Sequence, residues 1–245
     1  GYDGSRKVPL LFNFHGFGGS TNDHLNTSDM RQLADRDTFI LVYPQGSCLE
    51  GFSHWNAALP SATNKSTVDD LGFIDFLIND LSSNYEVDSA RIYACGYSNG
   101  AFFSYALACY LGHKIAAIGS VSGTMLDSSL QCSPSHPTAM INLHGTNDGV
   151  VPYNGSSEYI AIPDVVDYWC QQNNTDLSAS LSSENYLGTT IEKYLYANGD
   201  SAVSVEHYKI IGGGHDWFDI EFSGASTNEI LWDFLSKYDL YGRRP

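Results

Sequence analysis

The segment Gly96-Tyr97-Ser98-Asn99-Gly100 lies between a short apolar run and a run with helical spacing. Residues 91–95 predict a buried strand, and residues 99–110 predict a helix. A G-x-S-x-G pattern in this setting predicts a sharp strand-to-helix turn that holds the serine hydroxyl above the edge of a sheet. Its glycines remove β-carbons that would collide where the chain doubles back. Ser98 is therefore the candidate nucleophile, the alternative being a glycine-flanked serine in an ordinary turn.

A serine hydroxyl needs a base within hydrogen-bond reach, and in this kind of fold the partners follow in the order carboxylate, then histidine. Asp148 comes directly after a predicted buried strand at 139–144, at the edge where open α/β sheets place their chemistry. Asp164 and Asp167 are weaker candidates because they fall at or inside a predicted helix. Asp148 is the candidate carboxylate, although an aspartate in an ordinary Asx-turn would give the same pattern.

His215 follows three consecutive glycines, Gly212 to Gly214, after a predicted strand at 203–211. Such a glycine run lets the loop bend sharply and bring the imidazole over the serine. The competing histidines lie inside a predicted strand or in other loops: His207, His113 and His136. His215 is therefore the candidate base, and we expect activity to rise with pH as its imidazole loses a proton.

Acyl chemistry at Ser98 also requires N–H donors for a tetrahedral oxyanion. The backbone N–H of Asn99, one residue past the nucleophile, is the first candidate donor. The second is the backbone N–H of Phe17, in the loop at 15–19 that follows an early apolar strand. We expect His15 to brace this loop by hydrogen bonding and not to act in catalysis.

Strands and helices alternate along the chain, and most of the strands are apolar throughout. Strands are predicted at 8–15, 38–43, 91–95, 115–120, 139–144, 189–196 and 203–211, the last two as a hairpin-like pair. Helices are predicted at 22–36, from Thr67 with Asp70 in a near-capping box, and at 99–110, 163–172 and 226–237. Residues 48–65 form a long irregular stretch, predicted to be functional. This order predicts one α/β domain over residues 1–245, a mostly parallel sheet with helices on both faces.

Composition restricts the class of partner. Charged residues make up 16% of the chain, compared with about 25% in typical soluble domains, and this low content favours a secreted or periplasmic protein. The net charge of −16 disfavours nucleic acid, anionic membrane surfaces and polyanionic substrates such as unesterified pectin. No apolar stretch reaches the roughly 18 residues that span a bilayer. Neutral polymers and small esters remain open as substrates.

The chain contains five cysteines, an odd number, at positions 48, 95, 109, 132 and 170. Cys95 precedes the nucleophile turn inside a predicted strand, so we expect a buried free thiol there. The other four allow one or two disulfides in an oxidising compartment. None has the spacing of a metal site, and no metal is expected.

A set of motifs along almost the whole chain resembles the secreted feruloyl esterase, acetyl xylan esterase and polyhydroxybutyrate depolymerase-like group of α/β-hydrolases. The matching segments lie at 9–16, 43–46, 55–56, 68–73, 88–100, 107–109, 143–148, 151–153 and 212–217. There are two departures from the group. Phe17 stands where the group often has cysteine or another small residue. The chain also begins where the group has already formed one or two strands, so either N-terminal strands precede it or the sheet is smaller.

The resemblance implies an α/β-hydrolase fold and a cofactor-free carboxylic-ester hydrolase with Ser98, Asp148 and His215 as its triad. It also implies a disulfide between Cys109 and Cys132. The expected substrate is an acylated plant cell-wall polysaccharide or a fragment of one, from which feruloyl or acetyl groups are removed. An aliphatic polyester is the alternative substrate, and an inactive carbohydrate-binding module is the alternative of another class. We expect a monomer.

Tryptophans near the active edge are candidates for substrate binding. Trp55 and Asn56 lie in the long loop before Lys65, and Trp217 follows the candidate base by two residues. Either indole could stack on an acyl group or a sugar ring. The alternative is that both indoles pack under the loops as structural anchors.

Overall fold

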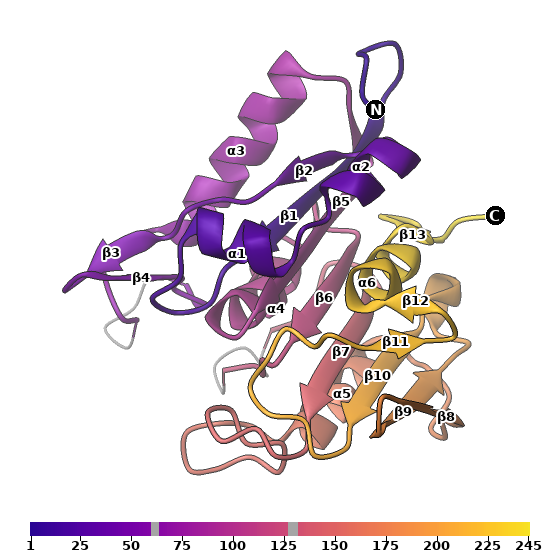
Figure 1. The fold of residues 1–245 in the computed structure, drawn as a ribbon. Helices are drawn as coiled ribbons and strands as arrows, with labels where there is room; N and C mark the ends of the chain where they lie inside the picture. Colours follow the sequence, from indigo (N-terminus) through magenta and orange to yellow (C-terminus); the bar gives the residue numbers. More distant parts are fainter. Residues whose placement is uncertain (60–63, 127–131) are drawn as a thin grey trace.

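The protein is built around a twisted central sheet (Figure 1), seen in a computed structural model that describes residues 1–59, 64–126 and 132–245. Within these residues the sheet has eight strands in the order β2-β1-β5-β6-β7-β10-β9-β8. The strands are β1 (Val8–Phe14), β2 (Ile40–Val42), β5 (Val87–Tyr97), β6 (Ala117–Val121), β7 (Ala139–Gly145), β8 (Ser180–Tyr186), β9 (Thr189–Tyr196) and β10 (Val205–Ile210). Short pairs are β3 (Ser47–Leu49) with β4 (Phe52–His54), β11 (Glu221–Phe222) with β12 (Ala225–Ser226), and β13 (Tyr238–Asp239) with β14 (Gly242–Arg243).

Strands β2, β1, β5, β6, β7 and β10 are adjacent in this order and pair in parallel. At the other end of the sheet, β9 pairs antiparallel with β10, and β8 pairs antiparallel with β9. The helices are α1 (Thr21–Thr27), α2 (Arg31–Asp37), α3 (Asp70–Asn84), α4 (Asn99–Tyr110), α5 (Ile162–Gln172) and α6 (Thr227–Leu235), with a 3-10 turn η2 (Asp200–Ala202). The predicted architecture, a mostly parallel sheet with helices on both faces, is confirmed.

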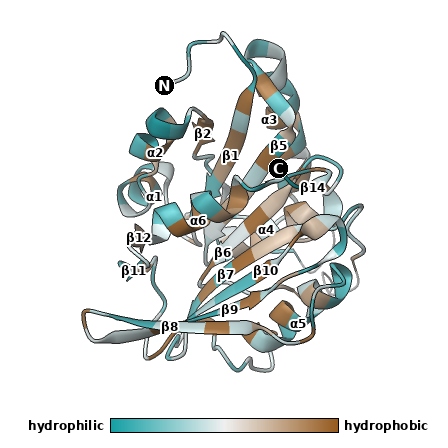
Figure 2. Ribbon diagram, turned by 90° about the vertical axis from the view of Figure 1, so that its right-hand side faces the viewer, coloured by the Kyte–Doolittle hydropathy of each residue, from teal (hydrophilic) through white to brown (hydrophobic). Residues whose placement is uncertain are grey.

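Two hydrophobic cores hold the layers together, one on each face of the sheet. Alternation along β1 shows how one strand serves both, because Leu10 and Phe12 face one core and Leu11 faces the other. Helices α3, α4 and α5 pack on the first face, and α2 and α6 pack on the second. Figure 2 shows the hydrophobic residues concentrated along the central strands between these layers.

The helix predicted over residues 22–36 is wrong as a single element, because the structure has two short helices, α1 and α2. The break falls at Ser28, whose hydroxyl donates to the carbonyl of His24 at 2.8 Å. The Tyr43 hydroxyl donates to the Ser28 carbonyl at 2.5 Å. These bonds satisfy the helix end with side chains, so the chain turns there instead of continuing.

The start of α3 and the long irregular stretch also need correction. Asp69, not Thr67, is the N-cap of α3, and its carboxylate accepts a hydrogen bond from the Gly72 N–H at 2.8 Å. Asp70 is buried and accepts from the Asn56 N–H at 2.7 Å, so it forms no capping box. The stretch at 48–65 contains the β3–β4 hairpin.

The hairpin-like pair is present as β9 and β10, and the prediction missed its outer neighbour β8. The structure contains a Cys109–Cys132 disulfide with a Cα–Cα distance of 5.5 Å. Cys95 is a buried free thiol, as predicted, and burial raises its pKa. No helix in the described part of the chain is long and apolar enough to cross a membrane.

Candidate active site

The turn between β5 and α4 places Ser98 in a strained backbone conformation. Its φ is 51° and its ψ is −119°, a region that residues with a β-carbon rarely adopt. The flanking glycines are required by packing. A β-carbon on Gly96 would lie 2.5 Å from the Gly100 carbonyl carbon, and one on Gly100 would collide with the Phe14 carbonyl. The turn therefore has the geometry that the sequence pattern predicts.

Ser98, His215 and Asp148 come together from three separate loops. The Ser98 Oγ lies 2.9 Å from Nε2 of His215, and Nδ1 of His215 lies 2.7 Å from Oδ2 of Asp148. This arrangement assigns the proton to Nδ1, which donates to the carboxylate and leaves Nε2 free to accept from the serine hydroxyl. The Tyr97 hydroxyl donates to the His215 carbonyl at 2.7 Å and fixes the loop that carries the imidazole.

Hydrogen bonds join the loops after β7 and β10. These bonds fix the distance between the Asp148 carboxylate and the His215 imidazole. The Asn147 N–H donates to the Gly213 carbonyl at 2.9 Å, and the Thr146 N–H donates to the Ile210 carbonyl at 2.9 Å. A β-carbon on Gly145 would collide with the Gly213 carbonyl. Small residues in both loops therefore permit this close approach.

Hydrogen bonds hold Asp148 as a carboxylate. Its Oδ1 accepts from the N–H groups of Val150 and Val151, each at 2.8 Å. His144 Nε2 lies 3.3 Å from Oδ2 and 2.8 Å from the Val151 carbonyl, so it donates toward both. Burial raises the pKa of Asp148, but the hydrogen bonds from His144, His215 and the backbone outweigh it and hold that pKa well below its usual value. Sequence reasoning missed His144, whose only signal was its place four residues before Asp148.

The two candidate oxyanion donors flank the serine. A β-carbon on Gly16 would lie 3.3 Å from the Ser98 Cβ, so the loop that carries Phe17 touches the turn that carries Ser98. Within the described part of the chain, neither the Phe17 N–H nor the Asn99 N–H donates a hydrogen bond. His15 braces this loop as expected: its Nδ1 lies 2.7 Å from the Gly16 carbonyl and its Nε2 accepts from the Gly46 N–H at 3.0 Å.

Trp55 links both candidate donors to the core. The Asn99 side chain accepts from the Trp55 N–H at 2.7 Å and donates to the Trp55 carbonyl at 2.9 Å. The indole Nε1 donates to the His15 carbonyl at 3.1 Å. The ring is only 1% exposed and stacks on Phe103 at 5.1 Å between centroids. Trp55 therefore has the contacts of a structural anchor.

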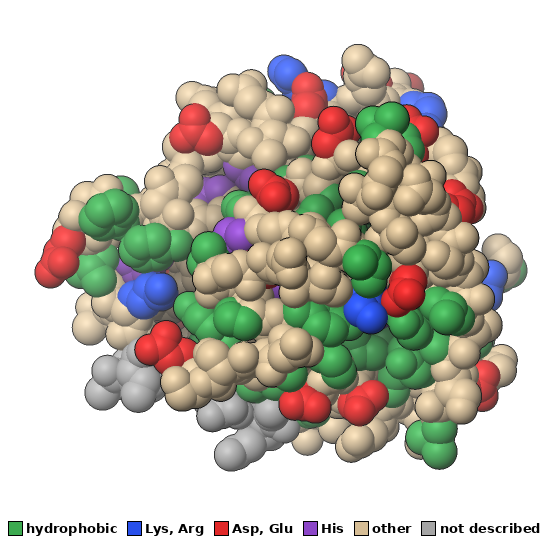
Figure 3. Space-filling model, turned by 60° about the horizontal axis from the view of Figure 1, so that its bottom comes forward, with side chains coloured by type: hydrophobic (Ala, Val, Ile, Leu, Met, Phe, Trp, Pro, Cys, Tyr) green, Lys and Arg blue, Asp and Glu red, His purple; other side chains and the backbone are tan. Residues whose placement is uncertain are grey.

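A cavity of about 280 Å³ opens beside Ser98. Its walls come from the loop at 15–19, residues 55–57 and 64–65, the turn at Ser98, helix α4 and the loops after β6 and β7. The lining residues are Phe17, Trp55, Asn56, Ala57, Asn64, Lys65, Ser98, Asn99, Phe102, Leu126, Val150, Val151 and Tyr159. Figure 3 looks onto the end of the molecule toward which the parallel strands point, and shows histidines at the surface with hydrophobic, uncharged and acidic side chains around them. The cavity suits a substrate that is largely apolar next to its reacting group.

The other two candidate substrate-binding residues, Trp217 and Asn56, differ in their relation to this cavity. Trp217 does not line this cavity: its Nε1 donates to the Asn228 side chain at 3.0 Å, and its ring meets His24 edge to face at 5.4 Å. Asn56 lines the cavity, but it is buried and its amide donates to the Val68 carbonyl at 2.8 Å and to Ser66 Oγ at 3.0 Å. The Asn56 side chain thus stabilises the loop that contains Ser66 and Val68.

Comparison with known proteins finds several relatives that are named as esterases. The chain is 26% identical over 234 residues to the bifunctional acetylxylan esterase/xylanase XynS20E of Neocallimastix patriciarum, covering 96% of this chain and 32% of that protein. It is 28% identical over 250 residues to feruloyl esterase B of Piromyces equi, covering 98% of this chain and 44% of that protein. The chain thus spans less than half the length of these two relatives.

A shorter relative and a solved structure match over most of their length. Feruloyl esterase C of Emericella nidulans is 26% identical over 241 residues, with 96% of this chain and 80% of that protein covered. The acetyl xylan esterase from Aspergillus awamori superposes with a TM-score of 0.70 at 15% identity, covering 94% of this chain and 89% of that one. The structural likeness shows the α/β-hydrolase fold.

The sequence pattern of the Phospholipase/Carboxylesterase family matches residues 4–162. This range contains the loop at 15–19, the turn at Ser98 and Asp148. The chain is therefore a member of the Phospholipase/Carboxylesterase family.

Proposed function

We propose that this chain is a serine carboxylic-ester hydrolase in which Ser98 is the nucleophile, His215 the base and Asp148 the carboxylate that orients it. The observation that carries the proposal is the continuous hydrogen-bonded chain from Ser98 Oγ through the imidazole to Asp148, with distances of 2.9 and 2.7 Å. The esterases among the relatives support the same chemistry.

The proposed reaction has two stages, acylation of Ser98 and hydrolysis of the acyl-enzyme. Ser98 Oγ attacks the ester carbonyl while Nε2 of His215 takes its proton, and Asp148 stabilises the imidazolium. The N–H groups of Phe17 and Asn99 donate to the oxyanion, which forms at the positive end of α4. The imidazolium then protonates the departing alcohol. Water, deprotonated by His215, hydrolyses the acyl-enzyme and releases the acid.

The proposed substrates are feruloyl or acetyl esters of plant cell-wall polysaccharide. The names of the relatives, acetylxylan esterase and feruloyl esterase, support this choice. The largely apolar cavity accommodates an acyl group next to Ser98. The Cys109–Cys132 disulfide supports an oxidising compartment such as the extracellular space or the periplasm.

The decisive test is Ser98→Ala. We expect kcat on para-nitrophenyl acetate to fall by about 10⁴-fold or more, with the far-ultraviolet circular dichroism unchanged. Ser104→Ala is the matched control, because Ser104 lies in α4, which begins directly after Ser98, and its hydroxyl donates to the Gly100 carbonyl at 3.0 Å. A fluorophosphonate should label the wild type and S104A but not S98A. Turnover by S98A close to that of S104A would reject the proposal.

A second experiment addresses the substrate. Methyl ferulate, acetylated xylan and hydroxybutyrate oligomers are compared by kcat/KM with the same enzyme preparation. We expect the first two to be preferred. A clear preference for hydroxybutyrate oligomers would assign the chain to polyester hydrolysis instead.

A further inference from the structure

The described part of the cavity lining beside Ser98 contains one charged side chain, and that side chain is a cation. Among the described residues that form its wall, Lys65 alone carries a full charge at neutral pH. The chain as a whole has 28 acidic and 12 basic residues, so an acidic side chain would be the more common occupant of any surface position. A lysine at the mouth of this cavity is therefore a specific feature of the site.

The ammonium group of Lys65 lies over an aromatic ring. The Lys65 Nζ lies 4.5 Å from the centroid of the Phe17 ring, within range of a cation–π interaction. Phe17 in turn stacks on Phe52, with 5.6 Å between centroids and 16° between planes. The two rings are 50% and 55% exposed. Lys65 forms no salt bridge with any described residue, so its charge remains available to a ligand.

The backbone next to Lys65 is fixed as well. The neighbouring Ser66 hydroxyl lies 2.8 Å from Nε2 of His54 and accepts from the Asn56 amide at 3.0 Å. The Ser66 N–H donates to the Asn56 Oδ1 at 3.3 Å. Because His54 and Asn56 are buried, the segment that carries Lys65 is fastened to the interior. The backbone that carries the cation is thus ordered before any ligand arrives.

We propose that Lys65 forms a subsite for a single carboxylate carried by the ester substrate, and so makes the enzyme selective for acidic esters. The inference rests on the proposed esterase function and adds the class of substrate. The carboxylate could belong to the saccharide, as a uronic acid side group beside the acylated sugar, or to the acyl group, as the free end of a dicarboxylic half-ester. The net charge of −16 repels polyanions, so one local carboxylate is favoured over a fully acidic polymer.

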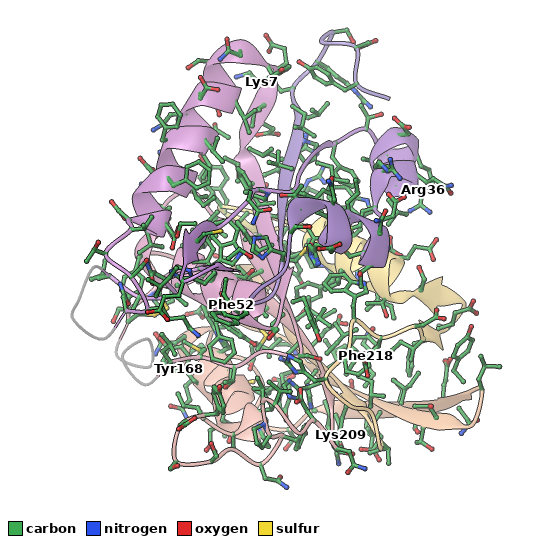
Figure 4. All side chains as sticks on the ribbon, turned by 60° about the vertical axis from the view of Figure 1, so that its left-hand side comes forward. Lys7, Arg36, Phe52, Tyr168, Lys209 and Phe218 are labelled. Carbon is green, nitrogen blue, oxygen red and sulfur yellow. A yellow bond between two sulfur atoms is a disulfide. The ribbon has the colours of Figure 1, made fainter. Side chains whose placement is uncertain are left out.

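The test compares matched pairs of neutral and acidic esters. One pair is para-nitrophenyl butyrate and mono-para-nitrophenyl succinate, and the other is acetylated xylo-oligosaccharides without and with a glucuronic acid side group. The variants are K65M, K65R and K65E. K7M is the charge-matched control, since Lys7 lies at the far end of the molecule from Phe52 (Figure 4).

We expect K65M to lower kcat/KM for the acidic member of at least one pair about fivefold more than for its neutral partner, through KM. K65R should retain the preference, and K65E should lose more than K65M because attraction becomes repulsion. Raising the ionic strength should weaken the preference of the wild type. The pair that responds identifies whether the carboxylate belongs to the acyl group or to the saccharide.

Equal effects of K65M on both members of both pairs, or the same change in K7M, would overturn the inference. Failure of the proposed function looks different. In that case the wild type would not hydrolyse para-nitrophenyl acetate, or S98A would hydrolyse it equally well.

Discussion

Replacing Trp55 by phenylalanine separates a structural role of this residue from a role in substrate recognition. The change keeps an aromatic ring but removes the indole N–H that donates to the His15 carbonyl at 3.1 Å. A buried carbonyl without its donor costs about 1–3 kcal/mol. The smaller ring also loses packing against Phe103.

Trp169→Phe is the matched control for the packing loss. Trp169 is fully buried and stacks on Tyr105 at 6.2 Å, but its Nε1 has no hydrogen-bond partner within the described part of the chain. W169F therefore loses packing alone, whereas W55F loses packing and a hydrogen bond. We expect the free energy of unfolding, measured by urea denaturation, to be about 1–3 kcal/mol lower in W55F than in W169F.

The effect on catalysis follows from what Trp55 holds. Its indole supports the loop of Phe17, and its backbone is clamped to Asn99. Removal of one oxyanion donor costs about 10²–10³ in kcat in serine hydrolases, and W55F loosens a donor without removing it. We expect kcat to fall about tenfold, with KM nearly unchanged, and W169F to keep wild-type kcat.

The assay compares para-nitrophenyl acetate with methyl ferulate. Because the Trp55 ring is buried, both substrates should lose the same factor in W55F. A loss confined to methyl ferulate would refute this reasoning and return Trp55 to substrate recognition. Stability equal to that of W169F would refute the hydrogen-bond argument.

Two further predictions concern stability. The double variant C109A/C132A removes a disulfide with a sequence separation of 23. We expect the free energy of unfolding to fall by about 3 kcal/mol, and calorimetry to show a Tm lower by roughly 6–12 °C. An unchanged Tm would contradict this prediction. Burial lowers the pKa of His207 to about 3. In mildly acidic solution the imidazole of His207 is therefore protonated in the unfolded chain and neutral in the folded chain. Stability at this site is therefore complete above pH ~6.5 and is lost as pH falls toward 3, by about 1.4 kcal/mol per unit. Urea unfolding at pH 7 and pH 5 should show a smaller acid loss in H207Q, and equal losses in both proteins would reject this assignment.

The parts of the fold that sequence predicts well are those buried on both sides. Every residue of β1 and of β7 is buried, so their apolar runs are unbroken and easily recognised. The polar strand β8, Ser-Leu-Ser-Ser-Glu-Asn-Tyr, gives no such signal, because as an edge strand it is almost entirely exposed. The end of α1 at Ser28 also cannot be predicted from the spacing of apolar residues, because it depends on a hydrogen bond from Tyr43, which is remote in sequence.

The candidate site divides in the same way. Ser98, Asp148 and His215 are predictable because glycines and strand ends mark their loops. The contacts of Trp217 could not be predicted, because a position two residues after His215 does not fix the direction of a side chain. Lys65 has no local signal at all, since its contact with Phe17 arises only when distant loops meet.

The outer edge of the sheet has a consequence for the behaviour of the protein in concentrated solution. A free edge strand offers unpaired N–H and C=O groups on which a second chain could add, the first step of ordered aggregation. On β8 this edge carries Glu184, whose carboxylate accepts from the N–H and hydroxyl of Ser223, each at 2.7 Å. The β11–β12 turn is thereby tied against the strand. A charged edge strand that is hydrogen-bonded to a neighbouring turn opposes the addition of a second chain. The same polar sequence that makes β8 hard to predict therefore protects the protein from edge-to-edge aggregation.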